Sequence, residues 1–110
     1  MTGGTPDMLA HIDETFGPLA VLYPFDSEEE AIKMANDTEY GLAGYFWSNN
    51  LSRAWRVAEA LNVGMVGING APVAQACAPF GGVNQSGYGR EGSKYGMEEY
   101  QEMKLIAMMV

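Results

Sequence analysis

The chain has 110 residues, of which 47% are hydrophobic, 11% aromatic and 18% charged, and this balance indicates a globular protein rather than a disordered one. Fourteen acidic side chains against six basic ones give a formal net charge of −8, which disfavours nucleic acid and anionic lipid as partners. No apolar run reaches 18 residues and residues 1–8 do not resemble a secretory signal, so we expect a cytoplasmic protein.

Metal chemistry has little support in the composition. Cys77 is the single cysteine and His11 the single histidine, so an internal disulfide is excluded. A site built from several thiolates or imidazoles would need more of these residues than the chain has. We therefore expect no metal.

The first part of the chain predicts a turn, a strand and a capped helix. Gly17-Pro18 indicates a turn, and residues 19–23 form an apolar run of strand length. Ser27 and Glu30 have the spacing of a capping box, and acidic residues fill the first turn, where the helix dipole favours negative charge. Residues 27–36 are therefore predicted to form a short amphipathic helix.

A strand, a helix and a second strand are predicted next. Residues 42–47 are rich in aromatic side chains, as strands often are. Asn49-Asn50 can cap a helix over residues 51–61, in which apolar residues recur at helical spacing. Residues 65–68 then have the character of a short buried strand. This order predicts a βαβ crossover and an α/β architecture.

The last third is rich in small residues. Residues 71–78 predict a loop, and residues 81–96 contain six glycines, which indicates tight turns or close backbone approach. A helical turn is expected within residues 95–102. Residues 105–110 form an apolar tail of strand length.

Residues 87–92 match the dinucleotide fingerprint G-x-G-x-x-G. That motif binds a pyrophosphate only between a strand and a helix N-terminus. Residues 80–86 make a poor strand, and no second strand ending in an acid follows at the usual distance. We therefore prefer a structural loop, with an independent nucleotide site as the alternative.

Three further side chains are candidates from their residue type. Cys77 could be a nucleophile, but no neighbouring base activates it, so a small apolar filler is the preferred interpretation. Glu14 could accept hydrogen bonds from a diol, and Phe16 could pack on a flat ring. From residue type alone, however, the preferred interpretation is that Glu14 caps a helix and Phe16 belongs to the core.

Five blocks, in order, resemble the motifs of the aldehyde dehydrogenase superfamily. They are D-E-T-F-G-P at 13–18, A-N-D-T-E-Y-G-L at 35–42, G-M-V-G-I-N at 64–69, A-P-F-G-G at 78–82 with S-G-Y-G-R-E-G at 86–92, and G-M-E-E-Y at 96–100 with Lys104. Residues 93–96, S-K-Y-G, most resemble the succinate-semialdehyde dehydrogenase branch. The resemblance implies that residues 1–110 are the C-terminal part of an α/β catalytic domain, with an oligomerisation strand at about 100–110.

The resemblance also implies a chemistry. In that family a cysteine thiolate adds to the aldehyde, hydride passes to NAD(P)⁺, and water hydrolyses the thioester. Cys77 does not match the family nucleophile. The nucleophile, the general-base glutamate and the NAD(P)-binding domain all fall upstream of Met1 in the family pattern. The resemblance therefore implies no catalytic residue in this chain and no activity of the chain alone.

Three positions carry binding roles by resemblance, and a fourth departs from the family pattern. Glu14 matches the glutamate that hydrogen-bonds the nicotinamide ribose, and Phe16 matches the phenylalanine beside the nicotinamide. Phe80 matches an aromatic residue that lines the substrate tunnel. Ala74 stands where the succinate-semialdehyde branch commonly has a serine that holds the substrate carboxylate, which counts against a dicarboxylic semialdehyde.

Two functions follow from the resemblance. The first is the C-terminal part of an NAD(P)-dependent aldehyde dehydrogenase, possessing contacts for the cofactor and for a small aldehyde. The alternative is a truncated, non-enzymatic module that associates with itself or a full-length relative through Leu105–Val110. Marginal stability or self-association is expected in both cases, because so short a chain buries little surface.

Overall fold

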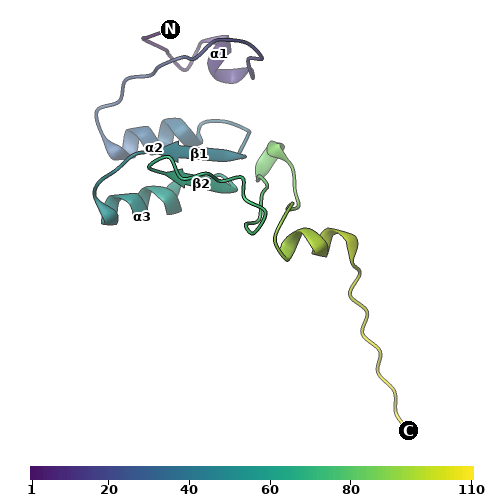
Figure 1. Cartoon of the computed structure of the whole chain (residues 1–110). Coiled ribbons are helices and arrows are strands. Elements are labelled where there is room, and N and C mark those ends of the chain that lie inside the picture. Colours follow the sequence, from purple (N-terminus) through teal and green to yellow (C-terminus); the bar gives the residue numbers. More distant parts are fainter. The chain divides into compact units, whose positions relative to one another are not determined.

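The computed structural model describes all residues from Met1 to Val110, and the chain divides into two units, Met1–Thr38 and Glu39–Val110 (Figure 1). Unit 1 contains the short helix α1 (Leu9–Ile12) and the helix α2 (Glu28–Asn36). Unit 2 contains the strand β1 (Ala43–Phe46), the helix α3 (Leu51–Ala60) and the strand β2 (Met65–Ile68).

The strand predicted over residues 19–23 is wrong. Only an isolated parallel bridge forms there, between Thr2 and Leu22, with the Leu22 amide donating to the Met1 carbonyl oxygen at 2.8 Å. The Gly4 amide donates to the Leu22 carbonyl oxygen at 3.0 Å, and the Met1 ammonium donates to that of Ala20 at 2.8 Å. Apolar residues of strand length form a strand only where a partner continues the ladder, and residues 1–4 form only one bridge, at Leu22.

The helix predicted over residues 27–36 is confirmed as α2. The Ser27 Oγ accepts a hydrogen bond from the Glu30 amide at 3.1 Å, as the capping spacing predicts. The Glu30 carboxylate, however, accepts from the Asp26 amide at 2.8 Å, one residue before the position that a standard capping box uses. The Ser27 hydroxyl satisfies one of the amides that the helix start leaves without partners, and the Glu30 carboxylate binds the chain just before the cap.

Unit 1 also encloses a small aromatic contact. The His11 ring meets the Tyr23 ring edge to face, with 5.4 Å between centroids, and His11 Nε2 lies 3.7 Å from Asp37 Oδ2.

Near the start of the chain, a hydrogen bond from the Thr5 side chain lowers the pKa of Asp7 below its usual value.

The predicted βαβ unit is confirmed in unit 2. β1 and β2 pair in parallel, with Ala43 opposite Met65 and Phe46 opposite Ile68, and α3 makes the crossover between them (Figure 1). Asn50 Oδ1 accepts from the Arg53 amide at 2.9 Å and so caps α3.

The core of the chain is small. Ala54 on the inner face of α3 and Met65 at the start of β2 are its buried hydrophobic residues, each 6% exposed. Many larger apolar side chains lie on the surface, among them Trp47 and Trp55. This exposure fits the expected marginal stability, because little apolar area leaves water on folding.

The glycine-rich segment after β2 contains two 3₁₀ helices, η1 (Asn84–Ser86) and η2 (Tyr95–Tyr100), the second within the residues where a helical turn was expected. The tail 101–110 is fully exposed and extended in the single chain (Figure 1). Pairing of Leu105–Val110 with another subunit needs a second strand, so it stays a prediction. None of the helices has the length and apolar character needed to cross a membrane.

The cap of α3 is open to a direct test. We expect Asn50→Ala to lower the free energy of unfolding by about 1 kcal/mol, because the Arg53 amide loses its acceptor. Asn49→Ala is the matched control, one exposed residue earlier, and should change it by less than about 0.5 kcal/mol. Urea unfolding followed by circular dichroism measures both. Equal losses in the two variants would contradict the assigned cap.

Candidate functional site

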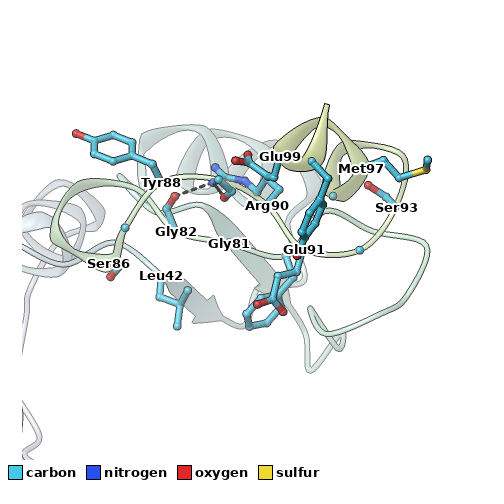
Figure 2. A pocket seen from close by; sticks show the side chains of 16 residues that line it. Leu42, Gly81, Gly82, Ser86, Tyr88, Arg90, Glu91, Ser93, Met97 and Glu99 are labelled. Carbon is cyan, nitrogen blue, oxygen red and sulfur yellow. Dashed lines mark hydrogen bonds between the residues drawn. The ribbon is translucent and has the colours of Figure 1, made fainter. Parts of the chain in front are cut away.

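The segment from Phe80 to Gly92 folds back on itself and forms one wall of a cavity in unit 2. The Phe80 amide donates to the Glu91 carbonyl oxygen at 2.8 Å, and the Glu91 amide donates to that of Phe80 at 2.7 Å. The cavity beside them has a volume of about 590 Å³ (Figure 2). Its other lining residues include Leu42, which directly precedes β1, and Met97, Glu99 and Tyr100 of η2.

The fold-back depends on glycine at defined points. Gly87 and Gly89 have φ values of +100° and +88°, which side-chain-bearing residues seldom adopt. The motif at 87–92 is preceded by the 3₁₀ helix η1 and followed by the 3₁₀ helix η2, and its one bridge joins Glu91 to Phe80. The strand, turn and helix that a pyrophosphate cradle requires are therefore not formed, and the structural interpretation of G-x-G-x-x-G is confirmed.

The loop is attached to the sheet at the entry to both strands. The Gly41 carbonyl oxygen, two residues before β1, accepts from the Gly64 amide at 3.0 Å and from the Val83 amide at 2.9 Å. The Gly41 amide in turn donates to Ser86 Oγ at 2.9 Å. The β1 entry, the β2 entry and the glycine-rich loop thus converge on one residue.

Phe80 and Ala74, the two predicted substrate contacts, are placed differently. Phe80 is half-buried and lines the cavity. Ala74 is exposed in the loop after β2 and does not line it. That loop is tied to the glycine-rich segment, because the Ser93 amide donates to the Ala76 carbonyl oxygen at 2.9 Å.

Cys77 is exposed, so the expected role as a buried filler is wrong. Its Sγ lies 3.9 Å from Gln75 Oε1, and an amide oxygen is no base that could generate a thiolate. No group of three or more His, Cys, Asp or Glu side chains is close enough together to hold a metal ion.

Glu14 and Phe16 lie in unit 1, in a stretch without helix or strand, and both are exposed. Residue type alone suggested a helix cap for Glu14 and a core position for Phe16, and both interpretations are wrong. Glu14 caps no helix, and the Phe16 side chain is 94% exposed. An accessible carboxylate and an accessible aromatic face fit the hydroxyls and the flat ring of a nicotinamide nucleotide. Their chemistry is therefore compatible with the cofactor contact that the motif implies.

Arg90 is a site residue that the sequence analysis did not single out. It is half-buried, lines the cavity, and donates through Nη1 to the carbonyl oxygens of Gly82 and Gly89 (Figure 2). Its position inside the S-G-Y-G-R-E-G block was the one available signal.

Comparison with known proteins decides the family. Residues 1–106 match the family model described as "Aldehyde dehydrogenase family". The chain belongs to the aldehyde dehydrogenase family. It is 58% identical over 102 residues to the mitochondrial succinate-semialdehyde dehydrogenases of Oryza sativa subsp. japonica and Homo sapiens, covering 93% of this chain and 19% of each relative. It is 53% identical over 108 residues to a 3-sulfolactaldehyde dehydrogenase of Pseudomonas putida, covering 98% of this chain and 22% of that protein.

Solved structures agree with the α/β fold. Succinate-semialdehyde dehydrogenase from Burkholderia pseudomallei is similar with a TM-score of 0.85 and 59% identity, over 89% of this chain and 20% of that one. An aldehyde dehydrogenase from Bacillus cereus, solved as an NAD⁺ complex, is similar with a TM-score of 0.87 and 46% identity, over 92% and 21%. The chain spans about one fifth of the length of these aldehyde dehydrogenases.

A substitution at Gly64 tests how closely the glycine-rich loop approaches the sheet. A Cβ atom there would overlap the Gly81 carbonyl oxygen, so Gly64→Ala should cost roughly 2–3 kcal/mol of unfolding free energy. At Gly17 nothing lies within 4 Å of such an atom, so Gly17→Ala is the control and should cost less than about 0.5 kcal/mol. Chemical denaturation measures both. A Gly64→Ala chain as stable as the control would contradict the close approach.

Proposed function

We propose that this chain supplies the C-terminal part of an NAD(P)-dependent aldehyde dehydrogenase, which oxidises an aldehyde to the corresponding acid. One observation carries the proposal. The family match extends over residues 1–106, almost the whole chain, while the chain corresponds to only about a fifth of each relative.

The contribution of the chain to that reaction is binding and enclosure. NAD(P)⁺, when bound, accepts the hydride in this family. The Glu14 carboxylate accepts hydrogen bonds from the ribose hydroxyls, and the exposed Phe16 ring packs beside the nicotinamide. Phe80 forms part of an apolar wall that keeps water away from the aldehyde.

The chain alone is proposed to be inactive. Thioester chemistry needs a thiolate and a base that activates it or the attacking water. Cys77 is the single cysteine, it is exposed, and the one polar contact of its sulfur is the Gln75 amide oxygen at 3.9 Å. Nothing in that arrangement generates or stabilises a thiolate.

The substrate class is the finer part of the proposal. Relatives named for succinate semialdehyde and for 3-sulfolactaldehyde both act on aldehydes with an anionic group at the far end. Ala74 lies in the exposed loop after β2, outside the cavity lining of the single chain, and its methyl group cannot donate a hydrogen bond to a carboxylate. We therefore propose a small aldehyde, with succinate semialdehyde bound less tightly than in relatives that have a serine there.

A chimera tests this function. Residues 1–106 would replace the corresponding segment of the human succinate-semialdehyde dehydrogenase, and NAD(P)H formation would be followed with succinate semialdehyde and with butanal. We expect turnover by the chimera and none by the 110-residue chain alone. Cys77→Ser should leave the activity of the chimera unchanged, because that sulfur takes no part.

Two results would contradict the proposal. One is turnover by the isolated chain that Cys77→Ser abolishes. The other is a folded chimera, shown by its melting and its NAD⁺ binding, that oxidises neither aldehyde.

The exposed tail favours a second candidate function, a non-enzymatic module that associates through Leu105–Val110. Every residue of that apolar segment is exposed in the single chain, and an unpaired apolar strand invites pairing with another chain.

Ile106→Lys tests the association. A charge in the tail opposes strand pairing, so sedimentation velocity should show the chain shifting to the monomer. Leu9→Lys is the matched control, since Leu9 is 74% exposed and Ile106 is 76% exposed. If both variants associate like the unmodified chain, the tail is not the contact.

A further inference from the structure

The two arms of the 80–92 segment share only one complete pair of backbone hydrogen bonds, between Phe80 and Glu91. In an antiparallel ladder such pairs recur at every second residue, so the next one would join Gly82 and Gly89. These two residues are joined instead by Arg90. Its Nη1 donates to the Gly82 carbonyl oxygen at 2.8 Å and to that of Gly89 at 2.7 Å (Figure 2). The guanidinium thus occupies the place of the next backbone pair.

Glycine at position 81 provides the space that this arrangement needs. A Cβ atom on Gly81 would lie 2.5 Å from the Gly89 carbonyl oxygen and 2.8 Å from Arg90 Cδ. Both distances are shorter than non-bonded atoms allow, so a larger residue would displace either the arm or the arginine. The glycines and the arginine of this segment therefore act together: the glycines leave room, and the Arg90 side chain fills it.

We infer that Arg90 is a positioning residue, which fixes the fold-back of the glycine-rich loop and thereby holds Phe80 on the wall of the cavity. This inference rests on the proposed function only in the role given to Phe80. The bridging of two backbone carbonyls by one guanidinium stands without it.

Arginine suits this role better than lysine. The guanidinium is planar, keeps its charge, and presents several N–H donors in a fixed geometry, while a lysine ammonium is a compact group on a flexible stem. Lysine can restore the charge and one hydrogen bond, but it holds the two carbonyls less firmly. Methionine has similar length and no donor.

Hydrogen exchange in the 110-residue chain measures the positioning directly. In Arg90→Met, the amides of Phe80 and Glu91 should exchange about tenfold faster, because the charged hydrogen bonds beside them are lost. Arg90→Lys should lie between Arg90→Met and the unmodified chain. The amides of Met65 and Asn69, which pair β2 with β1, should keep their rates. Lys33→Met, which removes an exposed cation from α2, is the control and should change none of these rates.

Kinetics in the chimera provide the second readout. Displacing Phe80 weakens the hold on the aldehyde, so Arg90→Met should raise KM about tenfold while kcat changes by less than about threefold. Arg90→Lys should recover part of that loss. If amide hydrogen exchange in the isolated chain is too fast to compare the variants, the KM of the chimera for the aldehyde decides whether Arg90 positions Phe80.

Three outcomes would overturn the inference: unchanged exchange of Phe80 and Glu91, equal acceleration of the β1–β2 amides, or an unchanged KM in Arg90→Met. A chimera that oxidises no aldehyde, combined with the expected exchange pattern, would reject the proposed function and leave the positioning by Arg90 intact.

Discussion

The Gly41 carbonyl oxygen is the point on which the organisation of unit 2 depends. It accepts from Gly64 at the entry to β2 and from Val83 in the glycine-rich loop, while the Gly41 amide donates to Ser86. A residue with a side chain would not fit, because a Cβ atom on Gly41 would lie 2.7 Å from the Val83 side chain and 2.9 Å from the Asn62 carbonyl oxygen. The parallel pair and the loop with Phe80 therefore share one anchor.

Close backbone approach replaces a large core in this chain. Ala54 and Met65 are the fully buried hydrophobic residues, and backbone hydrogen bonds and one guanidinium hold the fold-back that carries Phe80 on the wall of the cavity. Such an arrangement gives a defined geometry with little hydrophobic stabilisation. The large exposed apolar surface agrees with a chain that corresponds to about a fifth of its relatives' length.

The glycine-rich segment shows why a motif needs its structural context. Residues 87–92 match a dinucleotide fingerprint, yet one 3₁₀ helix precedes them and another follows, in place of a strand and an α-helix. The positive φ angles of Gly87 and Gly89 and the room beside Gly81 serve a fold-back instead. The same letters inside the ordered set of five blocks indicated the correct family, because order and spacing over most of a chain carry far more information than six residues.

The sequence by itself determined the elements whose causes are local. The Ser27 and Asn50 caps and the apolar spacing of α3 depend on neighbours within one or two helical turns, and the order of strand, helix and strand follows from such local patterns. All of them appear where they were predicted. Only the tertiary structure decided that residues 19–23 form one bridge and no strand, that Cys77 and Phe16 are exposed, and that Arg90 reaches across to Gly82. Each of these features depends on which other segment of the chain packs against the residue. Local sequence propensity does not determine such contacts.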